Sequence, residues 1–197
     1  VGTEACWSEL RKRNIPTLII LTKMDKENVK FEDVLAEIKG QLSDNAIPFS
    51  LPLGKSANFD GYINVITKKA RIFKDGKYHD DVAYDDKKDR VEELYEQLLE
   101  KVAESSEELL EKYFSGEELT PDDVRKGLLS GTKKGDVFPV GVISVENNVG
   151  INTLLDMVVK YLPSAGGREY QAFDQDGFLF HLDQKLDILF PLQLVNT

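Results

Sequence analysis

The chain has 197 residues, 41% of them hydrophobic and 30% charged, which is an ordinary composition for a globular protein. Its formal net charge of -10 argues against a protein that binds nucleic-acid backbones, and against a sequence-specific DNA partner, because such binding needs clustered Lys and Arg. The single cysteine excludes an internal disulfide, and no apolar run reaches the about 18 residues that cross a membrane. We therefore expect a cytoplasmic protein with no membrane partner and no metal site.

The first elements predict a strand whose carboxyl end carries polar groups. Residues 3–13 have the spacing of a short helix, in which Cys6 is expected as a small buried side chain. The β-branched run 17–21 is typical of a buried strand in a parallel sheet, and the polar group 22–25 follows it. Because open α/β sheets bind ligands at the carboxyl ends of their strands, we expect residues 22–25 to lie at a binding edge.

A helix, a second strand and the start of an insert follow. Apolar residues at 3–4 spacing predict a helix over 31–42, and the apolar segment 47–54 then completes a strand–helix–strand unit. Residues 58–82 contain short strand-like pieces. Between two of them, Asp75-Gly76 indicates a tight hairpin turn.

The rest of the insert is helical and acidic. Residues 86–104 and 109–114 have helical spacing, and Thr120-Pro121-Asp122-Asp123 is typical of the start of another helix. Between residues 85 and 120 there are 13 Asp or Glu and 5 Lys or Arg, a net charge of -8. Such a segment is either a solvated outer face or a contact surface for a partner, and composition leaves both open.

The α/β pattern returns with a buried strand over 137–143, which ends at Ser144-Val145, and an amphipathic helix over 151–162. The predicted fold class is therefore α/β, a doubly wound sheet with an inserted α+β subdomain. The expected parts are the first α/β segment at 1–54, the insert at 55–134, the end of the α/β domain at 135–164, and a linker with a possible strand at 165–197.

Asp25 has a position that suits recognition of a guanine base. Guanine presents two adjacent donors, its ring N–H and its exocyclic amine, and one carboxylate can accept both. Adenine cannot form this pair, so an Asp here would discriminate between the two bases. Lys23 can lay its methylene stem along the base while its ammonium stays polar. A Lys-x-Asp group after a strand also occurs in surface loops that bind nothing.

Longer stretches around these points carry a resemblance to one family. The matching residues are Ile15-Pro16 before the first strand, Phe49-Ser50-Leu51-Pro52-Leu53-Gly54, Asn58-Phe59-Asp60-Gly61, Glu108-Leu109-Leu110-Glu111-Lys112-Tyr113, Gly116-Glu117-Glu118-Leu119-Thr120, Asn148-Val149-Gly150 and Tyr161-Leu162-Pro163-Ser164. Together they resemble the guanine-nucleotide-binding domain of translational GTPases, of the elongation factor G type, over residues 1–164. Residues 178–181 resemble the first strand of the β-barrel that follows that domain.

The resemblance implies half of a P-loop GTPase sheet that binds GTP or GDP. In that family Asp25 would read guanine, Lys23 would pack on the base and Thr22 would brace the loop. The backbone N–H of Val145 would bond the guanine O6, and Ser144 would support Asp25. Thr22 stands where the family usually has Asn, and Val145 where it usually has Ala, which indicates a divergent paralogue.

The resemblance also implies a ribosomal partner, namely the stalk protein of the large subunit at the acidic insert, and a role in translocation. The chain starts directly on a helical pattern and contains no Gly-x-x-x-x-Gly-Lys-[Ser/Thr] phosphate loop. We therefore expect a piece of a GTPase with no catalytic residues of its own, whose Mg²⁺ ligands lie elsewhere in the parent protein. Two alternatives stay open. One is a ribosome-protection or release-factor-type GTPase, and the other is a non-hydrolysing interaction module with a decayed pocket.

Overall fold

The structure is a computed structural model that describes residues 2–54, 58–80, 82–164, 170–173 and 179–182. It divides into two units, Val1–Leu162 and Pro163–Thr197, and each is described by itself. The helices are α1 (Gly2–Lys12), α2 (Phe31–Gln41), α3 (Lys88–Ala103), α4 (Glu107–Phe114), α5 (Pro121–Lys134) and α6 (Ile151–Tyr161). A 3₁₀ turn covers Asp85–Lys87. The strands are β1 (Ile19–Leu21), β2 (Ala46–Pro48), β3 (Ser50–Leu53), β4 (Gly61–Asn64), β5 (Lys69–Lys74), β6 (Lys77–Asp80), β7 (Phe138–Val142), β8 (Tyr170–Phe173) and β9 (Leu179–Leu182).

The first unit is built on a three-stranded parallel sheet with the order β1-β7-β2. The registers pair Ile19 with Val140 and Ala46 with Phe138. The predicted α/β class is therefore confirmed. The last strand of the unit, β7, lies between the first two, so the chain returns from its insert to fill the centre of the sheet. The sequence pattern did not indicate this order.

The apolar segment 47–54, predicted as one strand, forms two strands in two different sheets. β2 belongs to the parallel sheet, whereas β3 pairs antiparallel with β4. At the junction the backbone N–H of Phe49 donates to the carbonyl of Val140 at 2.8 Å. One step further the buried hydroxyl of Ser50 accepts from the backbone N–H of Val142 at 3.0 Å. The Ser50 side chain thus satisfies a strand N–H at the point where the chain leaves the parallel sheet.

The second sheet is antiparallel, with the order β3-β4-β5-β6. The predicted hairpin turn between β5 and β6 is confirmed, since Asp75 and Gly76 have φ angles of 52° and 74°. Both residues in the left-handed region give the turn a twist that matches the twist of paired strands.

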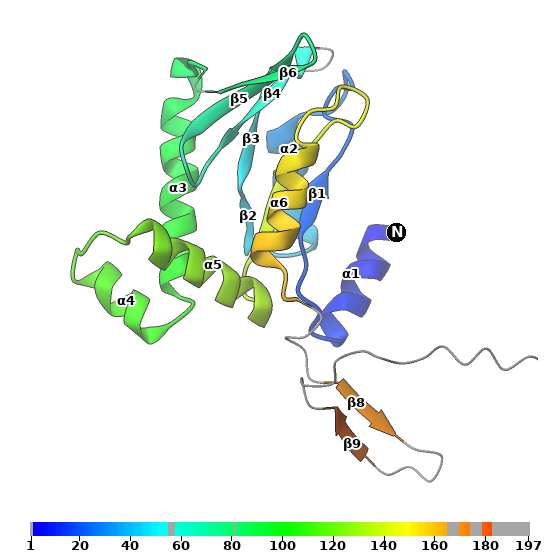
Figure 1. Cartoon of the computed structure of the whole chain (residues 1–197), viewed down its shortest axis with the longest axis vertical. Coiled ribbons are helices and arrows are strands. Elements are labelled where there is room, and N and C mark those ends of the chain that lie inside the picture. The colour runs from blue at the N-terminus through cyan, green and yellow to red at the C-terminus, as the bar shows by residue number, and fades with distance from the viewer. Residues whose placement is uncertain (1, 55–57, 81, 165–169, 174–178, 183–197) are drawn as a thin grey trace, which may run out of the picture. The chain divides into compact units, whose positions relative to one another are not determined.

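Three helices complete the insert. The Ser106 side chain caps α4 by accepting from the N–H of Leu109, and the predicted start of α5 is confirmed as a reciprocal capping box between Thr120 and Asp123. α3 runs along the antiparallel sheet (Figure 1) and contributes to both hydrophobic clusters of the unit. Its first half adds Val91 and Leu94 to the cluster under the two sheets. Its second half adds Leu98 and Val102 to a cluster that also contains Ile47, Phe49, Leu109, Val124, Leu128 and Met157.

One expectation for the helices is corrected, and two further features of their burial were not predicted. Cys6 is exposed rather than buried. All residues of α1 are described and none of them is buried. The helix contacts the sheet through half-buried Trp7, whose ring packs edge-on against Phe138, and through Arg11, whose guanidinium lies 4.5 Å from the centroid of the same ring. The apolar face of α6 is only partly covered: Met157 and Tyr161 are buried, but Leu155 is 59%, Val158 40% and Val159 82% exposed.

In the second unit β8 and β9 form a two-stranded antiparallel sheet, so the expected strand near residues 178–181 is present at Leu179–Leu182. Residues 183–197, the rest of the segment expected to hold a linker and a possible strand, lie outside the described residues. Within the part of the chain that the structure describes, no helix has the length and apolar character needed to span a membrane.

Candidate functional site

The carboxyl ends of β1 and β7 form one rim of the parallel sheet. The strands are direct neighbours, with Leu21 opposite Val142, and the N–H of Ile143 donates to the carbonyl of Leu21 at 2.9 Å. Because the strands are parallel and in register, the loops that follow them start side by side. The predicted groups 22–25 and 144–145 therefore lie together, although Asp25 and Ser144 are 119 residues apart in the sequence.

Asp25 and Ser144 are joined directly at this rim. The Ser144 hydroxyl donates to Oδ1 of Asp25 at 2.7 Å, and the Lys26 ammonium lies 3.0 Å from Oδ2. The Asp25 side chain is 8% exposed. The Ser144 hydrogen bond, followed by that of Lys26, lowers the pKa of Asp25, so the carboxylate is charged at neutral pH. Ser144 is fully buried and also accepts the N–H of Asn147 at 3.1 Å.

Lys26 and Glu146 form an ion pair across the rim that sequence reasoning did not identify. The Lys26 ammonium lies 2.7 Å from Glu146 Oε2, and the two carboxylates together raise the pKa of Lys26 to about 12. The sequence contained a signal for this pair: Lys26 directly follows Asp25, and oppositely charged Glu146 directly follows Val145. Both side chains are more than half exposed, so the pair orients the loops more than it stabilises the fold.

The other predicted residues lie at the same rim without side-chain bonds to it. Thr22 and Lys23 are exposed, and among the described residues neither side chain forms a hydrogen bond or an ion pair. Lys23 has a left-handed φ of 61°, which turns the chain sharply before Asp25. Val145 is 70% exposed, next to fully buried Ser144. The rim thus holds a nearly buried, charged carboxylate beside two exposed residues of the first loop and exposed Val145 of the second.

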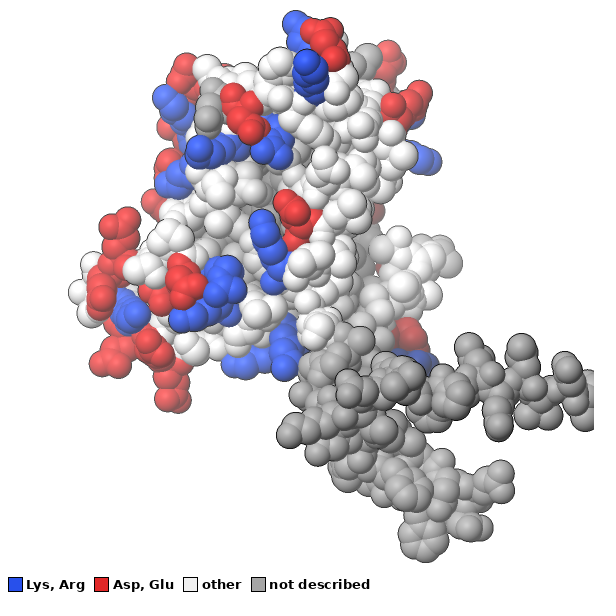
Figure 2. Space-filling view, viewed as in Figure 1, with Lys and Arg blue, Asp and Glu red and all other residues white. Residues whose placement is uncertain are grey.

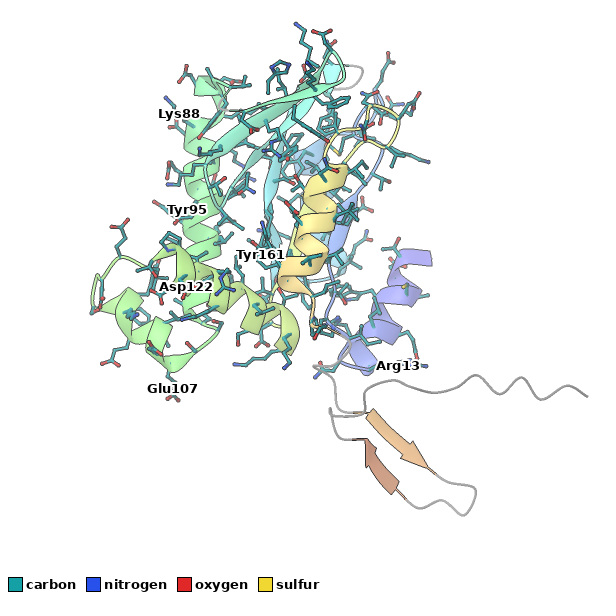
Figure 3. The ribbon with its side chains drawn as sticks, in the orientation of Figure 1. Arg13, Lys88, Tyr95, Glu107, Asp122 and Tyr161 are labelled. Carbon is teal, nitrogen blue, oxygen red and sulfur yellow. The ribbon has the colours of Figure 1, made fainter. Side chains whose placement is uncertain are left out.

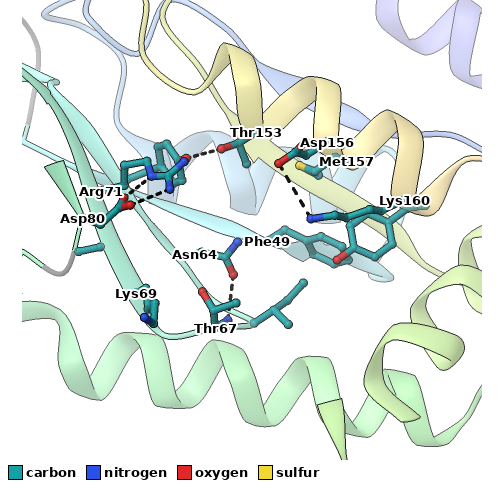
Figure 4. A pocket seen from close by; sticks show the side chains of 14 residues that line it. Phe49, Asn64, Thr67, Lys69, Arg71, Asp80, Thr153, Asp156, Met157 and Lys160 are labelled. Carbon is teal, nitrogen blue, oxygen red and sulfur yellow. Dashed lines mark hydrogen bonds and ion pairs between the residues drawn. The ribbon is translucent and has the colours of Figure 1, made fainter. Parts of the chain in front are cut away.

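A separate cavity of about 360 Å³ lies between the antiparallel sheet and α6 (Figure 4). Its lining includes Arg71 and Asp80, which pair with each other, and Asp156 and Lys160, which lie 3.9 Å apart. Neither Asp25 nor Ser144 lines it. The charged groups of this cavity thus pair mainly with one another, and the acceptor–donor set that suits a base is at the rim.

The acidic charge of the insert gathers around α4. Figure 2 shows the red side chains over this end of the unit, and Figure 3 shows Glu107 pointing outward from it. Among these acids Phe114 is 79% and Tyr113 38% exposed, with their ring centroids 6.1 Å apart. The acidic surface around α4 thus includes two neighbouring, exposed aromatic side chains.

Comparison with known proteins gives two findings. Residues 1–164 match the family described as Elongation factor Tu GTP binding domain. The structure is similar to the crystal structure of ttk003000868 from Thermus thermophilus, with a TM-score of 0.77 and 29% sequence identity. This similarity covers 83% of the present chain and 24% of the other chain, so the present chain spans about a quarter of the length of that protein.

Proposed function

Because the chain belongs to the family of elongation factor Tu GTP-binding domains, we propose that it carries the guanine-recognition part of a translational GTPase of the elongation factor G type. The observation that supports this most is the contact between Asp25 and Ser144, which places a charged carboxylate at the rim formed by β1 and β7. Family membership supports binding of a guanine nucleotide, and the rim offers the chemistry that guanine needs.

In the proposed complex Asp25 accepts both the ring N–H and the exocyclic amine of guanine. A carboxylate has about four acceptor sites, so Ser144 and Lys26 can remain bonded to it while the base binds. The backbone N–H of Val145 donates to the guanine O6, Lys23 lies along the base, and Thr22 braces the loop. Adenine would leave the Asp25 acceptors without donors, which is the basis of the expected selectivity.

We expect the chain to bind guanosine weakly and adenosine not at all under the same conditions. The test is an NMR titration of the ¹⁵N-labelled chain with each nucleoside, following the amide signals of residues 22–25 and 145. Guanosine should shift these signals to saturation in the millimolar range, and inosine, which lacks the exocyclic amine, should require a higher concentration. Equal shifts with adenosine would contradict guanine recognition. Negligible shifts with both nucleosides would favour the alternative of an interaction module with a decayed pocket.

We propose further that this chain is the second half of a complete nucleotide-binding domain. The exposed apolar residues of α6 and the edge position of β1 in its sheet support this, because a neighbouring strand and helix would cover both. The phosphate loop and the Mg²⁺ ligands would belong to the other half. Without them the chain should not hydrolyse GTP, since phosphoryl transfer depends on those groups.

The surface around α4 is the proposed contact with the ribosome, at the stalk protein of the large subunit. Its support is the acidic charge of the insert together with exposed Phe114, which could act as an apolar anchor. Phe114→Ala should weaken cosedimentation of the chain with large ribosomal subunits several-fold, whereas Val159→Ala, at an equally exposed apolar position on α6, should have no effect. Equal sedimentation of both variants and the wild type would rule out this contact.

A further inference from the structure

The loop that would present Val145 to the base is a short hairpin between β7 and α6. Its base is closed by two backbone hydrogen bonds between Ser144 and Val149, of 3.0 and 2.9 Å. Only residues 145–148 lie beyond this closure, and Asn148 adopts a left-handed φ of 54°. Within the tip the N–H of Asn148 donates to the carbonyl of Val145 at 3.2 Å, and the N–H of Asn147 donates to the Ser144 hydroxyl at 3.1 Å. Side-chain contacts with the insert add to these local bonds.

Two hydrogen bonds connect this tip to the insert. The side-chain amide of Asn147 donates to the carbonyl of Phe59 at 3.1 Å, and the Tyr78 hydroxyl donates to the carbonyl of Asn148 at 3.0 Å. Phe59 is 1% exposed and therefore anchored in the core, and Tyr78 lies on β6. Both partners come from the segment between β3 and β7, far in sequence from the hairpin that they hold.

Tyr78 is itself held in one orientation. Its ring packs against Phe73 on the neighbouring strand, with 4.9 Å between ring centroids, and the Arg71 guanidinium lies 5.5 Å from the ring centroid. Arg71 is in turn paired with Asp80 on β6 (Figure 4). Burial raises the pKa of the Tyr78 hydroxyl, so it keeps its proton at neutral pH and can donate to Asn148.

A third contact lies just beyond the hairpin. The Tyr62 hydroxyl on β4 and the Thr153 hydroxyl in the first turn of α6 form a hydrogen bond. Tyr62, Arg71 and Asp80 follow one another across the paired strands β4, β5 and β6, so they share one face of the antiparallel sheet. The antiparallel sheet thus contacts the hairpin tip through Tyr78 and contacts α6 through Tyr62.

We propose that Tyr78 and Asn147 are positioning residues for base recognition, through which the insert sheet holds the Val145 N–H in place opposite Asp25. The inference rests on the proposed binding of guanine at this rim and adds a role for the insert in it. Asp25 is held by Ser144 at the end of β7. The Val145 N–H is held by the bond from Val149 to the Ser144 carbonyl of the same peptide, and the contacts with the insert add to it. A change at the insert sheet would then alter guanine affinity without touching the base.

The test compares two variants that each remove one phenolic hydroxyl. Tyr78→Phe loses the bond to Asn148 but keeps the ring contact with Phe73. The matched control is Tyr84→Phe, since the Tyr84 hydroxyl donates to the carbonyl of Lys68 at 2.6 Å, within the insert and away from the hairpin. Guanosine affinity is measured by the NMR titration described above. Solvent exchange of the Val145 and Asn148 amides is measured without nucleoside, and the thermal midpoint is measured for each variant.

Tyr78→Phe should weaken guanosine binding about 3- to 10-fold, the effect of one net hydrogen bond, and should speed amide exchange in the hairpin. Tyr84→Phe should change neither. Asn147→Ala should act in the same direction as Tyr78→Phe. A guanosine affinity of Tyr78→Phe within twofold of the wild type would overturn the proposal. So would a loss of affinity in both Tyr78→Phe and Tyr84→Phe that follows the fall of their thermal midpoints. If the wild type shows no guanosine preference, the proposed function fails, and with it the positioning role. Faster amide exchange of the hairpin in Tyr78→Phe would then show that Tyr78 orders the loop without a role in base recognition.

Discussion

Leu98→Ala is expected to lower the free energy of unfolding by roughly 2–5 kcal/mol, the range for truncating a fully buried leucine. Leu98 is 0% exposed and lies on α3, in the insert. Its cluster also contains Ile47 of the parallel sheet and Phe49 at the junction of the two sheets. The cavity would therefore open between the insert and the parallel sheet, and we expect both to lose stability together.

The single tryptophan gives a local probe for this prediction. Trp7 packs edge-on against Phe138, with 4.6 Å between ring centroids, so its fluorescence reports on the parallel sheet. Far-UV circular dichroism reports on all the helices, including α3, α4 and α5 of the insert. In urea the two signals of Leu98→Ala should fall at one shared midpoint, lower than that of the wild type.

Leu155→Ala is the matched control, because it removes the same atoms from a leucine that is 59% exposed on α6. Its free energy of unfolding should stay within about 0.5 kcal/mol of the wild type. A Leu98→Ala variant in which the tryptophan signal keeps the wild-type midpoint while the helical signal shifts would contradict a shared core. It would show instead that the insert unfolds as an independent subdomain.

The local patterns in the sequence predicted the elements of the fold well. The run before Thr22 is a parallel strand, Asp75-Gly76 is a hairpin turn, and the capping box at Thr120 starts a helix, because each depends on neighbouring residues alone. The position of β7 between β1 and β2 depends on long-range pairing, for which a single sequence carries no direct signal. The same holds for the division of residues 47–54 between two sheets.

Burial was harder to predict than structure type. Cys6 was expected to be buried from its residue type, but it is exposed, and no residue of α1 is buried. Leu155 and Val159 have the spacing of a core-facing stripe and are exposed in this chain. An apolar stripe predicts a face that packs against another element, and it does not identify that element.

The candidate site was predictable as residue types and not as a network. Asp25 and Ser144 each end a strand, and the parallel register explains why they meet. The Lys26–Glu146 pair and the bond from Tyr78 depend on side-chain directions in loops, which no periodicity specifies. These contacts hold the two loops of the rim in fixed positions relative to each other.

The charge of Asp25 sets the pH range in which guanine recognition should operate. Its pKa is lowered, first by the Ser144 hydroxyl and then by Lys26, so it stays ionised above the ordinary Asp value of about 3.9. A carboxyl group with a lowered pKa favours the folded state above that value, and this contribution is lost as the pH falls through the lowered pKa. The preference for guanosine should stay constant near neutral pH, and it should be lost only when the pH falls through the lowered pKa of Asp25.

Asp25→Asn should abolish the preference for guanosine and create one for xanthosine. An amide replaces one acceptor oxygen by an NH₂ donor, so it can no longer accept both donors of guanine. Xanthine has a carbonyl in place of the exocyclic amine, and the new donor would match it while the remaining oxygen still accepts the ring N–H.

The measurement is the NMR titration with guanosine, xanthosine and adenosine, and we expect guanosine affinity to fall at least tenfold, equivalent to about 1.4 kcal/mol. Asp33→Asn, at an exposed position on α2, is the control with the same change of charge and should keep the wild-type order of nucleosides. A gain for xanthosine in Asp25→Asn would show that this side chain faces the base edge, since loss of fold or of charge cannot produce a new preference. If Asp25→Asn keeps the wild-type guanosine affinity, the base is bound elsewhere and the rim is not the recognition site.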